Sequence, residues 1–475
     1  MNHTSSREFV ARVDPSRLRP VSEGGPEKAI PLNDESQLFV DDYLIARRAS
    51  VHRRLNQPTK MEERILEPEH PWEGQAAVYG CVVREDDEYR LYYRGWIQDR
   101  SASCPYTASP ICLARGTDGR NFRRDAVPGG VHAGTNIVLD VAHDDFNILR
   151  DDSDRDPGRR YKLLAFVYGQ DSAGGLTPAW SADGLRWTWG PFGAIRNFGD
   201  RLSYWYDPVG RKHIAWSRDW SIVPSRVIME SQSDDFNSWS VEPRLAVQMD
   251  RHDHPGTQFY SGYAFWYRSM YLGYLEMYYT HLQRLDTQLI ASRDGRTWSR
   301  LCDREIFLPN GPHGDFDAYW AVPTYNPPIF AGGRLLIHYN GRPDPHRDAG
   351  FHHVKPGMGG AFALAELRED GFVSLDATGD EGLVETKLLA PPADTRRLEV
   401  NACPFNRRVG YAPMRLTVEV VTPDGKTLHA YEISPPGDPD ITWHVCPADG
   451  PFPQAVRLRF GAHNCRLYSF RWCRG

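Results

Sequence analysis

A short turn motif recurs five times along most of the chain. Each copy follows a β-rich run, contains Asp-Gly or a close variant, and usually precedes an aromatic residue. The copies are Thr117-Asp118-Gly119 before Phe122, Ser181-Ala182-Asp183-Gly184 before Trp187, Ser233-Asp234-Asp235-Phe236 before Trp239, Ser292-Arg293-Asp294-Gly295 before Trp298, and Asp370-Gly371-Phe372. Gly reaches positive φ and Asp tolerates it, so each copy is typical of a hairpin turn. Aspartates 118, 183, 234, 294 and 370 lie 65, 51, 60 and 76 residues apart, which indicates a structural repeat.

Three strand-like segments precede the first motif, at residues 77–84, 88–96 and 110–115. The later repeats contain the strand pairs 146–150 with 160–168, 202–206 with 212–218, 257–265 with 270–279, and 320–325 with 333–339. Four strands in each of five repeats predict an all-β fold whose main body, residues 36–392, is a five-bladed β-propeller. We expect residues 37–45 to pair beside the last repeat and so close the ring.

The remaining segments predict a second domain and an extension. Pro391-Pro392-Ala393-Asp394 is typical of a linker. Residues 395–475 show no helical period and contain the strand-like segments 398–402, 414–421, 427–433, 456–460 and 467–472, which predict a small C-terminal β-sandwich. Residues 1–35 are expected to form an N-terminal extension that is unstructured or loosely docked.

The composition argues against several classes of protein. The net charge is −6 with mixed signs, so no basic stripe favours nucleic acid. No apolar run reaches the roughly 18–20 residues of a membrane span, and residues 1–21 lack the apolar segment of a secretory signal, so we expect a cytoplasmic protein. The eight cysteines show no metal-binding spacing and are best interpreted as buried thiols, with a disulfide among Cys446, Cys465 and Cys473 as the alternative. The sequence indicates no cofactor and leaves the oligomeric state open.

Several short runs resemble one family of bacterial proteins. They are Leu38-Phe39-Val40-Asp41-Asp42-Tyr43-Leu44-Ile45, Pro71-Trp72-Glu73, Tyr92-Tyr93-Arg94, Arg160-Tyr161-Lys162, the Ser292–Trp298 motif and Leu467-Tyr468-Ser469-Phe470. The family is similar to the N-terminal five-bladed propeller of glycoside hydrolase family 32 and, distantly, to invertases, levanases and arabinanases. The resemblance implies hydrolysis of glycosidic bonds by three acids at the starts of innermost strands: an Asp in blade one, an Asp in blade three and a Glu in blade four.

The candidate catalytic residues are Asp200, Glu73 and Asp253. Glycoside hydrolysis needs one protonated and one ionised carboxyl group. Glu73 precedes the first strand of blade one, where Asp41 and Asp42 are rivals better explained as a turn, and Asp200 precedes the first strand of blade three. In blade four Gln258 stands where the family has Glu and cannot donate a proton, so Asp253 or His254 would have to replace it.

The candidate substrate-binding residues are Asp145, Asp317, Arg94, His254 and Trp96. Asp145 and Asp317 precede first strands of other repeats, and carboxylates there can accept hydrogen bonds from sugar hydroxyls. Arg94 and Arg218 end second strands and could reach an anionic substrate. Trp96 could stack on a sugar ring, although blade packing also explains it.

The sequence therefore predicts a carbohydrate-active protein. A glycoside hydrolase acting on a plant or algal glycan, or on its oligosaccharides, is the leading hypothesis. One alternative is an intracellular glycoside phosphorylase, with phosphate held by residues such as Arg94, Arg218, His254 and His338. The other is a non-catalytic carbohydrate-binding propeller, which the missing blade-four glutamate would suit.

Overall fold

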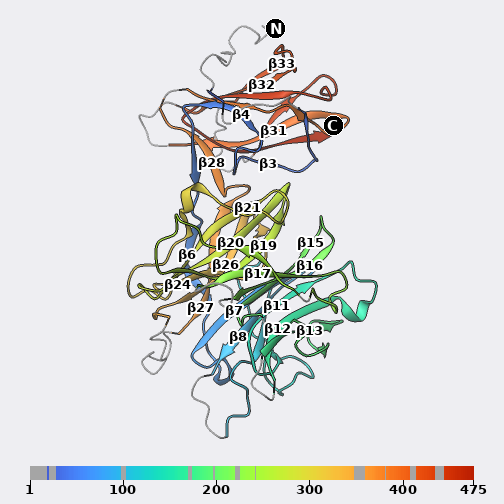
Figure 1. The fold of residues 1–475 in the computed structure, drawn as a ribbon, viewed down its shortest axis with the longest axis vertical. Coiled ribbons are helices and arrows are strands. Elements are labelled where there is room, and N and C mark those ends of the chain that lie inside the picture. Colours follow the sequence, from blue (N-terminus) through green and yellow to red (C-terminus); the bar gives the residue numbers. More distant parts are fainter. Residues whose placement is uncertain are drawn as a thin grey trace, which may run out of the picture. The chain divides into compact units, whose positions relative to one another are not determined.

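The computed structural model contains strands and no α-helix in the residues that it describes (Figure 1). These residues are 19–20, 28–97, 103–169, 174–195, 198–219, 225–240, 242–346, 359–379, 381–406, 413–433 and 443–474. The chain forms two compact units, residues 57–368 and residues 1–56 with 369–475. No helix in the described part is long and apolar enough to cross a membrane.

Three sheets of the first unit are four-stranded antiparallel meanders, each formed from consecutive strands. The first contains β7 (Ala76–Arg84), β8 (Tyr89–Trp96), β9 (Ile111–Gly116) and β10 (Ile137–Leu139). The second contains β11 (His143–Arg150), β12 (Tyr161–Tyr168), β13 (Gly174–Ser181) and β14 (Thr188–Trp189). The third contains β15 (Leu202–Asp207), β16 (Lys212–Asp219), β17 (Val227–Ser233) and β18 (Arg244–Val247).

Two further runs share one ten-stranded sheet, joined at a single pair between Leu285 and Trp320. The fourth run contains β19 (Thr257–Tyr267), β20 (Met270–Tyr279) and β21 (Arg284–Ser292), with β22 (Ser299–Arg300) and β23 (Ile306–Leu308) on β21. The fifth contains β24 (Trp320–Pro323), β26 (Arg334–Arg342), β27 (Ala361–Arg368) and β6 (Thr59–Leu66), with β25 (Ile329–Ala331) on β26. A strand that precedes the first run therefore completes the last one.

The first strands of successive runs contact one another: β7 with β11, β11 with β15, and β15 with β19. Tyr325, just after β24, brings the last run to the first, because its amide donates to the carbonyl of Gly80 at 2.9 Å. The side chain of Asn147 then donates to the carbonyl of Tyr325 at 2.8 Å and accepts from the amide of Tyr204 at 3.2 Å. Buried asparagine amides thus bond first strands that are not hydrogen-bonded as a sheet.

The recurring motif follows the third strand of a run, as the sequence predicts. In the copy after β13, the Asp183 carboxylate accepts from the amides of Leu185 and Arg186, both at 2.9 Å, and Ser181 Oγ accepts from Gly184 N at 2.9 Å. Asp118, Asp235 and Asp294 accept hydrogen bonds in the same pattern. These four copies are therefore side-chain-stabilised turns rather than ligand motifs, whereas the fifth, Asp370, belongs to the second unit and accepts from Ser469 Oγ at 2.6 Å.

The second unit has two six-stranded sheets. One orders β1 (Arg19–Pro20), β4 (Ile45–Ala49), β29 (Gly382–Thr386), β35 (Arg457–His463), β32 (Arg415–Val421) and β33 (Thr427–Ile433). The other orders β34 (Trp443–Pro447), β31 (Thr395–Pro404), β36 (Cys465–Arg474), β28 (Val373–Ala377) and β5 (His52–Leu55), with β3 (Gln37–Leu38) on β36. Short strands β2 (Ile30–Pro31) and β30 (Leu389–Ala390) pair separately. One apolar core draws residues from both sheets, among them Phe39, Val418, Phe460 and Phe470.

The structure corrects the prediction for the closing strand. Residues 37–45 do not complete the last run, because Gln37 and Leu38 pair with Phe470 and Ser469 in the second unit. Thr59–Leu66 pairs with β27 instead. The prediction failed because both segments are β-prone, and only long-range pairing distinguishes them.

The division of the chain also differs from the predicted boundaries of 36–392 and 395–475. It passes between residues 56 and 57 and between 368 and 369, so the N-terminal strands β3, β4 and β5 belong with the C-terminal sheets. The predicted linker at 391–394 lies inside that second unit. Cys446, Cys465 and Cys473 are free thiols and form no disulfide.

Candidate active site

Arginines and aromatic residues gather where the second strand of a run ends and the first strand begins. These two ends are adjacent because the two strands are antiparallel. We call this set the arginine–aromatic cluster; it consists of Tyr79, Arg94, Trp96, Arg201, Arg218, Tyr260, Trp320 and Arg342. Each guanidinium in it lies over a ring: Arg94 over Trp96 at 4.6 Å, Arg201 over Tyr79 at 4.0 Å, Arg218 over Tyr260 at 4.3 Å and Arg342 over Trp320 at 4.5 Å.

Tyr79 holds the cluster together through an unusual backbone. It has φ of 45° at a β-bulge between Val78 and Gly80, a conformation that costs free energy for a residue with a side chain. Its ring lies 6.1 Å from that of Trp96 and 6.4 Å from that of Trp320. The bulge therefore turns this ring toward residues of two other strands.

Asp200, the leading catalytic candidate, lies at this cluster just before β15. Nε and Nη2 of Arg218 each lie 2.7 Å from its Oδ1, and a quarter of its side chain is exposed. Burial raises the pKa of Asp200, but the charge of Arg218 and a hydrogen bond with Asp144 outweigh that effect and leave it lowered. Asp200 is therefore an ionised, partly exposed carboxylate.

Asp144 is the site residue that the sequence interpretation missed. Arg94 Nη1 lies 3.1 Å from its Oδ1, and Tyr168 Oη donates to its Oδ2 at 3.0 Å. Burial, followed by the charge of Asp144, raises the pKa of Tyr168, so this phenol remains a donor. An interaction with Asp144 contributes to the lowered pKa of Asp200, so the two side chains are neighbours. The pair thus offers two adjacent carboxyl groups, each held by an arginine.

Asp145 lies next to this pair but is fully buried. Its carboxylate accepts from Arg201 Nη1 at 2.5 Å and from the amide of Leu202 at 3.1 Å. Arg201 also donates to Glu276 at 2.9 Å, so one arginine bridges two buried acids. Burial raises the pKa of Asp145 to about 7 and also raises that of Glu276, while Arg201 lowers both. Arg201, a member of the cluster, is thus held by two buried acids, and neither acid offers an exposed oxygen.

The structure does not bring Glu73 to the cluster. Glu73 is fully buried in a 3₁₀ turn (Pro71–Glu73). Its carboxylate accepts from Tyr93 Oη, from Arg124 Nε at 2.7 Å and from the amides of Glu69 and His70 at 2.7 and 3.0 Å. Its oxygens are therefore engaged by the protein itself.

Asp253, the third catalytic candidate, forms ion pairs with Arg300 and, at 2.9 Å, with Arg304. These contacts anchor the loop before β19, and no described contact joins Asp253 to Asp144 or Asp200. Neighbouring His254 is exposed and lies beside His281, with ring centroids 5.0 Å apart and the rings tilted by 30°. Gln258 contacts Arg226, which lies 6.0 Å from the ring of Tyr260 at the edge of the cluster.

Asp317 is buried elsewhere in the fifth run. It pairs with Lys60 at 2.5 Å and accepts from Tyr339 Oη at 3.1 Å. Lys60 lies on β6, so this contact ties the completing strand to its sheet. Of the predicted site residues, the structure therefore brings together Asp200, Arg94, Trp96 and the buried Asp145.

No three His, Cys, Asp or Glu residues in the described ranges are grouped to hold a metal ion. What the cluster offers is a carboxyl pair, arginine donors and ring faces. Carboxyl groups can exchange protons, arginines can bind anionic oxygens, and aromatic faces can pack on sugar rings.

No protein-family model matches this chain, and no curated protein matches it. Among solved structures, it is similar to a thermostable family-43 glycoside hydrolase, with a TM-score of 0.45 and 12% identity over 64% of this chain and 94% of that one. It is similar to a GH130-family protein, from a structure on mannoside phosphorylases and glycoside hydrolases that target β-1,2 mannosidic linkages, with a TM-score of 0.45 and 12% identity over 66% and 94% of the two chains. A glycosyl hydrolase from Bacteroides ovatus has a TM-score of 0.45 and 12% identity over 71% and 97%. All of these TM-scores lie below 0.5, so function has to be inferred from the chain's own residues.

Proposed function

We propose that this protein is a carbohydrate-active enzyme, a glycoside hydrolase that acts on a plant or algal glycan or on its oligosaccharides. The observation that carries the proposal is the carboxyl pair Asp144 and Asp200, partly exposed and held between Arg94 and Arg218. Glycoside hydrolysis needs both a protonated and an ionised carboxyl group. The family resemblance of the sequence supports the same reaction.

In the proposed mechanism Asp200 is the ionised group, acting as nucleophile or as base toward water, and Asp144 is the general acid. Substrate would bind between these two carboxyl groups, as the separated acid and base of a glycosidase require. Arg218 would hold Asp200 in place, and Tyr168 and Arg94 would hold Asp144.

The proposal includes a finer description of the fold. Five successive antiparallel runs favour a five-bladed β-propeller with the cluster at the end of its axis, since the first strands of runs one to four contact in order and Tyr325 joins the last run to the first. Two sheets that share one core favour a β-sandwich for the second unit.

The test is a screen of the purified protein against aryl glycosides and plant and algal oligosaccharides. We expect one class of substrate to be cleaved, and Asp200→Asn and Asp144→Asn each to lower turnover at least a hundredfold, the scale of acid–base groups. Glu73→Gln is the matched control, since it removes a buried carboxylate outside the cluster. Full activity in Asp200→Asn would contradict the mechanism, and binding without cleavage would favour a non-catalytic binding protein.

A second candidate is a glycoside phosphorylase, which the arginines favour. Arg94, Arg201, Arg218 and Arg342 belong to one cluster, and guanidinium groups bind phosphate through paired donors. In this reaction phosphate replaces water as the nucleophile. Running the same screen with and without inorganic phosphate separates the two, because only a phosphorylase releases a sugar 1-phosphate.

A further inference from the structure

A crevice separates the third and fourth runs away from the arginine–aromatic cluster. Its volume is about 160 Å³, and its walls include Trp205, Ile214, Tyr271 and Trp298. Tyr271 is the second residue of β20, and Trp298 follows the Asp294 turn. The crevice therefore lies where the recurring turn of one run faces the second strand of the run before it.

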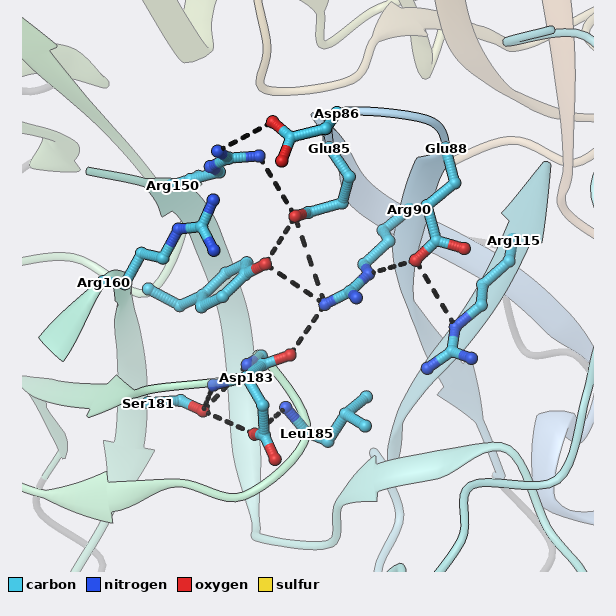
Figure 2. A network of polar contacts seen from close by, with 12 residues as sticks. Glu85, Asp86, Glu88, Arg90, Arg115, Arg150, Arg160, Ser181, Asp183 and Leu185 are labelled. Carbon is cyan, nitrogen blue, oxygen red and sulfur yellow. Dashed lines mark hydrogen bonds and ion pairs between the residues drawn. The ribbon is translucent and has the colours of Figure 1, made fainter. Parts of the chain in front are cut away.

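The equivalent position between the first and second runs is filled by Arg90, as Figure 2 shows. Arg90 Nη1 donates to the carbonyl of Asp183 at 2.7 Å, and its Nε donates to Glu88 at 2.7 Å. Tyr161, which begins β12, donates to Glu85 at 2.6 Å. One guanidinium thus bridges the strand and the turn.

The same elements recur around the crevice, but the bridging guanidinium there belongs to Arg244, which donates to Glu230 at 2.8 Å and to the carbonyl of Gly295 at 3.4 Å. Tyr271 Oη donates to Asp207 at 2.7 Å, as Tyr161 does to Glu85. Trp216 packs on Trp298 at 5.0 Å and corresponds to Tyr92, which donates to the carbonyl of Gly184 in the facing turn. Arg90 lies two residues before Tyr92, and Ile214 lies two residues before Trp216, so Ile214 holds the position that corresponds to Arg90. Ile has no polar group to reach across, so the space remains open.

A second, wider cavity of about 800 Å³ adjoins the crevice. Trp298 and Arg296 line both cavities. Trp298 is half-buried and Arg296 is exposed, so an aromatic edge and a guanidinium remain available between them. The two cavities are therefore adjacent at these two residues.

The polar groups of the crevice suit a neutral ligand. Asp294 is ionised, since hydrogen bonds outweigh the effect of burial and lower its pKa to about 2, and it accepts from the amides of Arg296 and Thr297. Glu230 is paired with Arg244 at 2.7 Å. Both oxygens of Glu230 are engaged, by Trp216 Nε1 at 2.8 Å and by Gln232 and Arg244, so the exposed carboxylate of Asp294 is the acceptor open to a hydroxyl group. Aromatic walls with such acceptors are the chemistry that binds carbohydrate rings.

We propose that the crevice and the cavity beside it form a second carbohydrate-binding site, for a neutral oligosaccharide segment that packs against Trp298. This site is separate from the Asp144 and Asp200 pair and does not depend on catalysis there.

Affinity gel electrophoresis with linear arabinan, arabinoxylan or galactomannan in the gel tests the proposal. Asp200→Asn serves as the background, so that the polysaccharide is not degraded. We expect at least one of the three to retard the protein, and Trp298→Ala to weaken the retardation at least fivefold. Ile214→Arg should fill the crevice as Arg90 does and have the same effect by an independent change.

Trp187→Ala is the matched control, because Trp187 occupies the same place in the turn that faces Arg90. It should leave retardation unchanged. The proposal is overturned if none of the three polysaccharides retards the background protein, if Trp298→Ala and Ile214→Arg both bind as it does, or if Trp187→Ala loses as much. Retardation is measured without turnover, so the binding result can be read even if the hydrolase proposal fails.

Discussion

Arg218 places two nitrogens, Nε and Nη2, each at 2.7 Å from the same oxygen of Asp200. The other oxygen of this carboxylate is therefore the one left to meet Asp144 or a substrate. Since Arg218 also lies over the ring of Tyr260, its position is fixed from two sides. This ion pair both ionises and orients the proposed nucleophile or base.

Replacing Asp200 should cost stability as well as turnover. Asp200→Asn leaves the buried Arg218 without its carboxylate, so we expect the free energy of unfolding to fall by about 1–3 kcal/mol, the scale of hydrogen bonds to charged groups. Denaturant unfolding checks this, and unchanged stability would show that Arg218 finds another partner.

Glu73→Gln should destabilise without touching chemistry. The change removes the charge that faces Arg124 in a buried site, so we expect a loss of about 3 kcal/mol, typical of breaking a buried ion pair. Thermal unfolding measures it. The kcat of the folded variant should match the wild type, and a hundredfold loss of kcat would instead place Glu73 in the mechanism.

Asp286 should make stability depend on pH. It is buried with Tyr279 Oη 3.1 Å away, and burial raises its pKa to about 7, against the opposing effects of Tyr279 and Arg284. The folded protein therefore holds this proton more tightly than the unfolded chain, whose pKa is about 3.9. Its contribution to stability is fully present below pH 4 and is lost as pH rises toward 7.

Asp286→Asn removes that titration. Unfolding free energies at pH 5 and pH 8 should differ less in the variant than in the wild type, with the gain appearing at pH 8. Asp424→Asn, at an exposed carboxylate, is the control and should leave the difference between the two pH values largely as it is. An unchanged difference in Asp286→Asn would refute the assignment.

Gly184→Ala should be costly for two reasons. Gly184 has φ of 73°, and a Cβ there would lie 2.4 Å from Tyr92 Oη. Gly332→Ala is the matched control, since Gly332 has φ of 58° with nothing within 4 Å of a Cβ. We expect about 1 kcal/mol for the control, from strain alone, and clearly more for Gly184→Ala. Equal losses in the two unfolding curves would show that Tyr92 moves aside.

The strands of the repeats could be predicted because the information is local. A turn such as Asp183-Gly184 bonds to its own backbone, and the apolar segments beside it are long enough to identify. The choice of β6 over residues 37–45 could not be predicted, because it depends on pairing with β27 far along the chain.

The site was only partly predictable for a related reason. Asp200 and Arg94 followed from their places at strand ends, whereas Asp144 and Asp145 are sequence neighbours that a strand sends to opposite sides. A β-bulge between His143 and Phe146 sets which one meets Asp200, and no local pattern reveals it. Glu73 fits the sequence pattern equally well, yet Tyr93 and Arg124 take its oxygens.

Completion of the fifth run by β6 has a consequence for synthesis on the ribosome. Thr59 pairs with Glu366, so the first unit, residues 57–368, cannot be completed until its last strand has been made. The second unit can be completed only later, because β3, β4 and β5 are synthesised first but pair with β36, β29 and β28. Residues 57–368 are thus an insertion within a discontinuous domain. The topology therefore fixes the order in which the two units can be completed during synthesis: the first unit before the second.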